Sequence, residues 1–367
     1  MVLKYIGRFL SKILLGCNVL VALLMLLCAY SSYLNPVSYP ILACAGLAFP
    51  VFLLLNLLFL LFWLVCYRRY ALLSLVVMFA CVYQIRAYVP VNLPTPKSEI
   101  PKDAIKILSY NVMAYNHDKP HKADSPNEII EYLINCGADI VCTQEAVLNK
   151  GKNSKFLNEE TVKKALSVYP YHSHVQENAN AWDCFSRYPI LSSKKIKYES
   201  VANGSVAYEV KLGADTLLLV NNHFESNKLT ADDKTAYKAM IIDPKEENLK
   251  ATSRLLIGKV ADAVAIRAPQ ADCVAKYVRD SGHKYVVVCG DFNDSPISYV
   301  HRVMSEGLND AFTDTGCGLG ISYNRNGFYF RIDHILASDS LEIYNCRVDN
   351  RIKASDHYPI SCYIRKR

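Results

Sequence analysis

Residues 285–294 read Tyr-Val-Val-Val-Cys-Gly-Asp-Phe-Asn-Asp, and this stretch decides the fold. Its first five residues are apolar and three of them are valine, which predicts a strand that is buried on both faces. Asp291, Asn293 and Asp294 follow directly after this run. Binding sites of α/β folds lie where the strands end, so these polar residues are candidates for a functional site in an α/β domain.

Five further polar clusters border predicted strands, and all are rich in Asn, Glu, Asp or His. A single cluster has little meaning, because Asp and Asn cap turns routinely. The six clusters would come together at one site if their strands end at the same edge of a sheet. The other five cover residues 109–112, 143–145, 221–224, 331–334 and 355–357.

The predicted strands outnumber the helical segments between them. This ratio favours two stacked sheets with helices outside over one parallel sheet. A helix is predicted over 127–135 from its apolar spacing. The predicted strands cover 105–110, 139–143, 190–196, 205–210, 216–221, 285–289, 331–337 and 360–364.

The residue types in the clusters indicate a hard cation, since carboxylate and amide oxygens suit Mg²⁺. The 13 cysteines include no Cys-x-x-Cys pair and histidines are few, so no zinc cage is predicted. A cation beside Asp and His groups can neutralise a phosphate while a carboxylate deprotonates water. We expect Mg²⁺, with Mn²⁺ as the alternative, and no organic cofactor.

The order of these motifs resembles that of the endonuclease/exonuclease/phosphatase superfamily, which includes pancreatic-type deoxyribonuclease, neutral sphingomyelinase and inositol-polyphosphate 5-phosphatases. The resemblance covers residues 103–367. It implies a four-layer α/β/β/α sandwich with the site at one mouth. The matching motifs are Asn111, Gln144-Glu145, Ser-Arg-Tyr-Pro-Ile (186–190), His223, Gly-Asp-Phe-Asn (290–293), Arg-Ile-Asp (331–333) and Ser-Asp-His (355–357).

The resemblance also implies a metal site and a role for each of its residues. Glu145 would be the principal Mg²⁺ ligand, with Asn111 beside it and Asp356 near the metal. These three residues come from three separate motifs.

Five further residues would carry out the reaction by the same resemblance. Asp291 would orient and deprotonate the attacking water, and Asn293 would hold the scissile phosphate. His357 would contact a phosphate oxygen while Asp333 keeps its imidazole protonated. His223 would be a second histidine that faces the phosphate.

Two features near these motifs can each be interpreted in two ways. Some members of the superfamily pair an acidic residue with the histidine at the position of 223. Here Asp183 is the candidate, although a surface-loop acid is the favoured interpretation. His172 and His174 share one face of a strand, where an exposed strand end is favoured over a metal pair.

The N-terminal third has a different character from the rest of the chain. No charged side chain occurs from residue 13 to residue 67, and one membrane-spanning helix needs roughly 20 apolar residues. A third apolar run follows and is interrupted late by Arg86. The prediction is an anchor over 1–89, with spans at about 11–33, 41–66 and 70–89.

The positive charge of the chain is concentrated in this anchor. The formal charge is +7, yet residues 1–96 hold six basic and no acidic residues, which leaves a net +1 for 97–367. Lys4, Arg8 and Lys12 precede the first span, and Arg68 and Arg69 follow the second. The positive-inside rule puts both groups in the cytoplasm. The catalytic domain is then extracytoplasmic with three spans, and cytoplasmic with two.

A linker and one large domain complete the chain. Four prolines predict an extended, semi-rigid linker over 90–102. The domain covers 103–367 and contains a helical insertion at 229–282, which is either a solvated cover or a lid that shapes the substrate site.

The sequence therefore predicts a membrane-anchored, Mg²⁺-dependent phosphoesterase that hydrolyses a phosphodiester or phosphomonoester through an activated water. The alternatives are a nuclease acting on nucleic acid and a non-catalytic receptor for a phosphorylated ligand. A nuclease would need a basic groove, which a net +1 does not favour. The predicted partners are the lipid bilayer and a lipid head group, nucleotide or nucleic acid. No oligomeric state is predicted.

Overall fold

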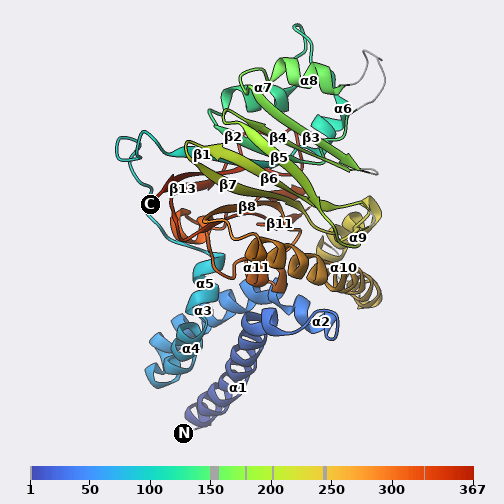
Figure 1. The fold of residues 1–367 in the computed structure, drawn as a ribbon. Helices are drawn as coiled ribbons and strands as arrows, with labels where there is room; N and C mark the ends of the chain where they lie inside the picture. The colour runs from blue at the N-terminus through green and yellow to red at the C-terminus, as the bar shows by residue number, and fades with distance from the viewer. Residues whose placement is uncertain (1, 149–156, 178–179, 201, 243–245, 326) are drawn as a thin grey trace.

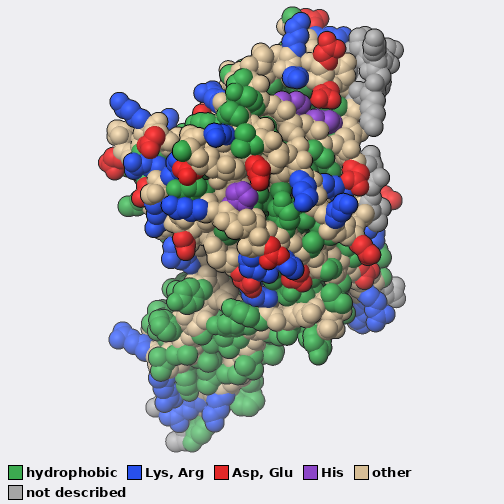
Figure 2. Space-filling model, in the orientation of Figure 1, with side chains coloured by type: hydrophobic (Ala, Val, Ile, Leu, Met, Phe, Trp, Pro, Cys, Tyr) green, Lys and Arg blue, Asp and Glu red, His purple; other side chains and the backbone are tan. Residues whose placement is uncertain are grey.

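The computed structural model describes residues 2–148, 157–177, 180–200, 202–242, 246–325 and 327–367. A bundle of N-terminal helices forms one end of the molecule, and two stacked sheets with helices outside form the rest (Figure 1). Hydrophobic side chains cover the surface of the bundle, whereas charged side chains of both signs are spread over the sheet region (Figure 2).

The bundle consists of five α-helices and two 3-10 turns within the described residues. Two segments, Tyr5–Tyr33 and Pro40–Cys66, are long and apolar enough to cross a membrane. The helices and turns are α1 (Val2–Tyr30), η1 (Ser31–Tyr33), α2 (Pro40–Ala43), η2 (Cys44–Ala48), α3 (Phe49–Cys66), α4 (Arg68–Ala80) and α5 (Val82–Tyr88).

The third predicted span corresponds to two helices instead of one. α4 and α5 meet at a bend of 66°, so the number of segments that could span a membrane is two, or three if this pair crosses as a unit. α4 alone has 13 residues and covers about 20 Å at 1.5 Å per residue, less than the about 30 Å of a bilayer core.

Buried polar side chains join the helices of the bundle. The indole N–H of Trp63 on α3 donates to Asn18 Oδ1 on α1 at 2.9 Å. The amide of Asn18 donates in turn to Ser74 Oγ on α4 at 3.2 Å. All three helices therefore share one hydrogen-bond network in the interior of the bundle.

The connection between α1 and α3 lies against the outer helices of the sheet region. η1 contacts α11 (Tyr299–Met304), and α2 and η2 contact α10 (Glu246–Asp280). Arg302 on α11 donates to the carbonyl of Ser32 at 2.9 Å. Gly46 allows a close approach here, because a Cβ would lie 3.1 Å from Ser31 Oγ and 3.5 Å from the carbonyl oxygen of Ile297.

The proline-rich segment is extended, but it follows the edge of the sheets instead of standing free. The Asn92 amide donates to the carbonyls of Thr313 and Gly316 at 3.0 and 2.8 Å. Thr95 exchanges two hydrogen bonds, both 2.7 Å, with the side chain of Asn345. These contacts attach residues 92–95 of the linker to the sheet region.

The first sheet has six strands, and its centre is a parallel pair, β1 and β2, between antiparallel neighbours. In spatial order the strands are β13 (Leu341–Val348), β14 (Ile360–Lys366), β1 (Ile105–Asn111), β2 (Ile140–Gln144), β4 (Asn180–Ser186) and β3 (Tyr171–Glu177).

The second sheet repeats this plan, with β7 and β8 as its parallel pair. In spatial order its strands are β5 (Ile190–Ile196), β6 (Gly204–Leu212), β7 (Asp215–His223), β8 (Tyr285–Asp291), β12 (Asp333–Ser338) and β9 (Leu308–Asp310). β10 (Tyr323–Arg325) and β11 (Phe328–Phe330) pair separately.

Alternate residues of β8 point into two different cores. Val287 and Cys289 pack between the two sheets, and Val286 and Val288 pack against α10 and α11 on the outer face. A third cluster packs α7 (Glu128–Asn135) and α8 (Glu159–Ala165) on the first sheet. The predicted four-layer α/β/β/α sandwich, preceded by apolar helices, is confirmed.

Two short helices and the predicted insertion complete the fold. α6 (Met113–Asp118) is a left-handed turn with positive φ throughout, and α12 (Ala311–Thr315) is capped by the Asp310 carboxylate. The predicted insertion contains α9 (Ala231–Ile242) and α10. Ala271, Val274 and Ala275 of α10 are buried against the second sheet, so this half of the helix is an integral layer.

Candidate active site

The structure brings the polar clusters together at one edge of the two sheets. Asn111 ends β1, Glu145 follows β2, and His223, Asp291 and Asp333 lie in one cross-strand row. They meet because the parallel strands end at the same edge and β12 begins there. A cavity of about 270 Å³ is lined by six of the predicted residues: Glu145, His223, Asp291, Asn293, Asp356 and His357. A larger hollow of about 660 Å³ beside the linker contains none of them.

The structure explains why a glycine and a serine occupy two positions in the motifs. Gly290 has a φ of +129°, and a Cβ there would overlap the carbonyl oxygen of Asn222 on β7. The Ser355 hydroxyl donates to the Asn111 carbonyl at 2.8 Å and accepts the His357 N–H at 3.2 Å. Gly290 therefore lets β7 and β8 approach, and Ser355 holds the His357 loop at the end of β1.

His357 lies between two buried carboxylates. Its Nδ1 is 2.8 Å from Asp333 Oδ2, and its Nε2 is 3.5 Å from Asp291 Oδ2. Burial opposes a charged ring, but Asp333 and Asp291 outweigh it and raise the pKa of His357 well above its usual value. Burial raises the pKa of Asp291 to about 6, against the opposing effect of His357. The centre thus holds an imidazolium and a carboxylate that titrates close to neutrality.

Asn111 connects the two halves of the site. Its Nδ2 donates to Glu145 Oε1 at 3.0 Å and to Asp291 Oδ2 at 3.2 Å, while its Oδ1 accepts the Met113 N–H. Asn111 therefore presents N–H groups and not its oxygen to these carboxylates. The interpretation of Asn111 as a metal ligand stays a prediction.

His223 is oriented by Asn180 and not by the predicted acid. Asn180 Oδ1 accepts the Ala181 N–H, so its Nδ2 faces His223 Nδ1 at 2.8 Å. His223 Nε2 then carries a proton, and it lies 3.7 Å from Glu145 and 3.6 Å from Asp291. The candidate pairing of Asp183 with His223 is wrong.

Asp183 instead belongs to a buried cluster on β3 and β4. Its Oδ1 lies 2.9 Å from His172 and 2.7 Å from His174, and the Tyr115 hydroxyl donates to its Oδ2 at 2.6 Å. Burial opposes the charge of Asp183, but the two histidines outweigh it and lower the pKa of its carboxyl. The favoured interpretations, a surface-loop acid and an exposed strand end, are both wrong, because these side chains cover one another.

Asn293 and Asp356 occupy loops at the cavity. Asn293 has a left-handed φ of 53°, which Asn tolerates, and its Nδ2 donates to the Phe224 carbonyl at 3.0 Å. Glu145 has the same φ, which is unusual for a longer side chain and marks local strain at this edge. Asp356 lines the cavity from the loop before β14.

Residues 108–357 match the Endonuclease/Exonuclease/phosphatase family, and residues 11–88 match a domain of unknown function (DUF8431). The first match covers more than half of the chain. The chain belongs to the Endonuclease/Exonuclease/phosphatase family. Members of this family are hydrolases that act on phosphate esters, and they are typically dependent on divalent metals. No curated protein matches the chain.

Solved structures of the same family share the fold at low sequence identity. A humanized D. rerio TDP2 is 15% identical, with a TM-score of 0.52, and the match covers 72% of this chain and 100% of that one. The human Nocturnin catalytic domain with bound sulfate is 16% identical, with a TM-score of 0.50 and coverage of 73% and 96%. A protein of the family from Beutenbergia cavernae is 14% identical, with a TM-score of 0.50 and coverage of 72% of both chains.

The donor groups of this family member fit a divalent cation. Glu145, Asp291, Asp333 and Asp356 supply four carboxylates, against the single imidazolium of His357. A phosphate anion would be repelled from such a centre without further positive charge. Glu145 is the most exposed of the three carboxylates that contact His223 or His357, with 39% of its side chain accessible, and its interpretation as the principal metal ligand stays a prediction.

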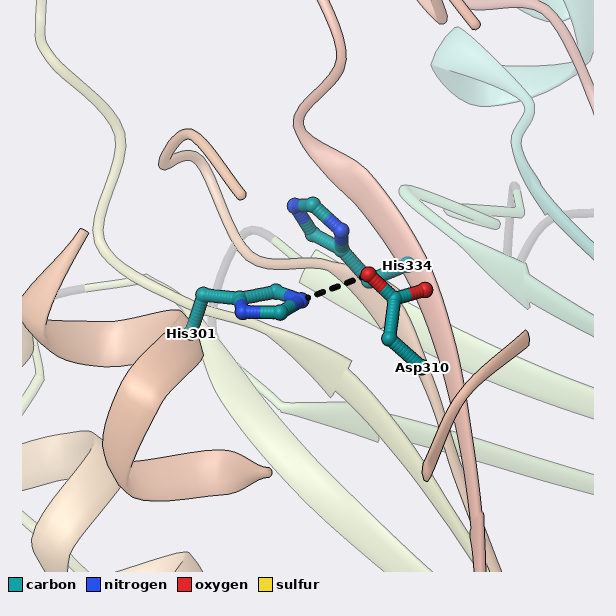
Figure 3. Close-up of side chains that lie close together, drawn as sticks. All are labelled: His301, Asp310 and His334. Atoms are coloured by element: carbon teal, nitrogen blue, oxygen red, sulfur yellow. Dashed lines mark hydrogen bonds and ion pairs between the residues drawn. The ribbon is translucent and has the colours of Figure 1, made fainter. Parts of the chain in front are cut away.

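A second His and Asp cluster lies outside the site of this family member. Ligand atoms of His301, Asp310 and His334 lie within 4.8 Å of one another (Figure 3). Asp310 already accepts from His301 Nε2, from Thr313 Oγ1 and from two backbone N–H groups. His334 Nε2 donates to the Asp294 carbonyl. The protein itself satisfies most of these groups, so the cluster is a structural connection between α11, α12 and β12.

Sequence reasoning missed several residues of the site. Asn180 lies on a strand that was not predicted, and the Tyr323 ring lies 5.1 Å from the His357 ring. Arg267 is buried on α10 and its Nη2 is 3.2 Å from Asp294. Trp182 and Phe185 are residue types that favour a strand over 180–186, whereas no local pattern points to Tyr323 or Arg267.

Proposed function

We propose that this chain is a membrane-anchored, divalent-metal-dependent hydrolase that cleaves a phosphate ester by attack of an activated water. The observation that carries the proposal is the buried row of Asp291, His357 and Asp333 beside the exposed carboxylate of Glu145. A scaffold or receptor of phosphorylated ligands has no use for a general base, so Asp291 favours catalysis over the receptor alternative.

Asp291 is the proposed base. A pKa of about 6 leaves it ionised at neutral pH and still close enough to that pH to accept a proton from water. Asp333 holds the His357 ring through Nδ1, which leaves Nε2–H to face a phosphate oxygen. Asn293 and His223 would contact the other phosphate oxygens. Mg²⁺, or Mn²⁺, held by Glu145 with Asn111 and Asp356 would supply the positive charge that the phosphate requires.

The first prediction concerns this row of residues. Asp291→Asn and His357→Gln should each lower kcat for bis(p-nitrophenyl) phosphate and p-nitrophenyl phosphate by about a thousandfold, because each removes a proton-transfer or charge-stabilising group. The assay uses the full chain in detergent with Mg²⁺, and EDTA should remove the activity.

Asp339→Asn is the matched control, since Asp339 is exposed and its side chain accepts a hydrogen bond from Asn309, away from the cavity. Circular dichroism must show that every variant is folded. Turnover within threefold of the unchanged chain in either site variant would show that the assignment is wrong.

We also propose an extracytoplasmic position for the catalytic domain. Support comes from the arrangement of the bundle: the connection of α1 with α3 and the end of α5 both lie at the sheets, whereas the N-terminus lies at the far end (Figure 1). With the basic residues in the first turns of α1 and at 68–69 in the cytoplasm, the domain lies across the bilayer.

A further inference from the structure

One wall of the candidate active site comes from the N-terminal bundle. Leu47 of η2 lines the same cavity as Asp291 and His357. η2 lies near the start of Pro40–Cys66, the second of the two segments that can cross a membrane. The catalytic groups therefore lie beside the end of the bundle at which its helices would leave the bilayer.

The cavity is amphipathic. The catalytic carboxylates and histidines form one side, while the other side consists of half-buried apolar side chains from four different parts of the chain. Phe328 is supported from α9 by the Tyr237 ring, at 4.4 Å between ring centres. The apolar wall comprises Leu47, Leu229, Val260, Phe328, Phe330 and Ile332. A small hydrophilic ester has no apolar surface to bury against this wall, whereas a hydrocarbon chain has.

Exposed apolar residues continue from the bundle onto the neighbouring helices. Ile41 and Leu42 on α2 are 63% and 43% exposed, and Leu255 and Ile257 on α10 are 51% and 48% exposed. α2 and α10 contact each other. A soluble surface rarely gathers such residues beside a cavity, so this face is suited to the surface of the bilayer.

The charges at the cavity do not favour a nucleic acid. Of the described residues that line it, the two with fixed positive charge are Lys228 and Arg267. Lys228 is 2.8 Å from Glu225, and Arg267 is 3.2 Å from Asp294. Both cations are already paired, which leaves no basic track for a polyphosphate backbone.

We infer that the substrate is an amphiphilic phosphate ester, namely a phospholipid of the bilayer that holds the N-terminal helices. This inference rests on the proposed phosphoesterase function. The phosphate lies at Asp291 and His357, and the hydrocarbon lies along Leu47, Val260 and Phe328. The bundle thus forms part of the substrate site in addition to any role as an anchor.

The test compares esters that differ only in their hydrocarbon. The full chain is reconstituted with Mg²⁺ in phosphatidylcholine vesicles that contain phosphatidic acid, phosphatidylglycerol or sphingomyelin. The matched soluble compounds are glycerol 3-phosphate for phosphatidic acid, glycerophosphoglycerol for phosphatidylglycerol, and the phosphodiester glycerophosphocholine for sphingomyelin. At least one lipid should be hydrolysed with a kcat/KM ten times that of its soluble counterpart or more. p-Nitrophenyl phosphate and bis(p-nitrophenyl) phosphate report the basic reaction in the same vesicles.

The apolar wall is tested by the ratio of lipid to p-nitrophenyl ester turnover. Leu47→Glu should lower this ratio at least tenfold, because a charged side chain in the wall disfavours contact with hydrocarbon. Leu47→Met should keep the ratio of the unchanged chain, because methionine is apolar. Val260→Glu on α10 tests the same wall if Leu47→Glu does not fold. Leu191→Glu is the control, since Leu191 lies exposed on β5, and it should leave the ratio unchanged.

The outcomes separate this inference from the proposed function. Turnover of the p-nitrophenyl esters without a preference for any lipid, or an unchanged ratio in Leu47→Glu and Val260→Glu, overturns the lipid inference alone. Faster hydrolysis of single-stranded DNA or RNA than of every lipid overturns it as well. An absence of turnover of every ester overturns the proposed function and this inference together.

Discussion

Asn180 shows how one residue sets the chemistry of its neighbour. Its amide oxygen is held by the Ala181 N–H, so its nitrogen must face the His223 ring. His223 therefore directs a donor toward Glu145 and Asp291 without needing a carboxylate partner. The sequence motif identifies His223, but the partner comes from another sheet and has no motif of its own.

His334 is a residue whose burial makes stability depend on pH. Burial, with His301 and Arg331 nearby, lowers the pKa of His334 to about 3, against the opposing charge of Asp310. The folded state therefore keeps this ring neutral, while the unfolded chain protonates it near pH 6.5. Its stabilising contribution is complete above that pH and is lost as the pH falls from about 6.5 toward 3.

The second prediction follows from the direction in which stability changes with pH. Between pH 7 and pH 5, the free energy of unfolding of the full chain in detergent should fall by about 2 kcal/mol through His334. His334→Gln can still donate to the Asp294 carbonyl but does not titrate, so its unfolding free energy should vary less over this range. His117→Gln, at an exposed position, serves as the control. Equal pH dependence in His334→Gln and in the unchanged chain would refute the assignment.

Helices and strands could be predicted from the sequence where their residues form a clear local pattern. Helix 127–135 is found as α7, where Asn127 caps the first turn through the Ile129 and Ile130 N–H groups. The strand predicted at 285–289 is found as β8, because valines on both faces leave no other interpretation. β4 was missed, since a buried Asp183 resembles a loop residue until the histidines of β3 are placed beside it.

The third prediction belongs to the bundle. Asn18→Leu removes the acceptor of the Trp63 indole and the donor to Ser74, which leaves both partners buried without that bond. Bonds of this kind between membrane helices contribute about 0.6 to 1.7 kcal/mol each, so the full chain should unfold in detergent at a lower temperature. Leu20→Ala, on the exposed side of α1, should change this temperature little. An unaltered unfolding temperature in Asn18→Leu would contradict a stabilising role.

The whole molecule joins a near-neutral enzyme domain to an apolar bundle. Arg86 pairs with Asp314 at 3.2 Å, and Arg331 donates to the carbonyl of Ala87, so α5 is attached to the sheet region. Lys and Arg side chains gather at the far tip of the bundle (Figure 2). This position is the one expected if they set the orientation of the helices in the membrane. The whole-chain charge of +7 therefore bears on topology more than on substrate.

The fourth prediction concerns the side of the membrane. A reporter that is active only outside the cytoplasm should be active at the C-terminus, and a reporter that matures only in the cytoplasm should be active at the N-terminus. The reason is that the bundle separates the basic residues from the sheets. Exchange of Arg68 and Arg69 for glutamine should weaken this preference. Both ends on one side would mean that α4 and α5 do not cross.

The sequence by itself determined the fold class and the polar residues that meet at the candidate active site, because each motif directly borders an apolar strand and both signals are local. Asp291, His357 and Glu145 could be named without coordinates for this reason. Only the tertiary structure decided that Asn180 orients His223, that Asp183 serves a separate cluster, and that Leu47 lines the catalytic cavity. Those relations join segments far apart in the chain, and they depend on how two sheets and a bundle pack together and not on any local pattern.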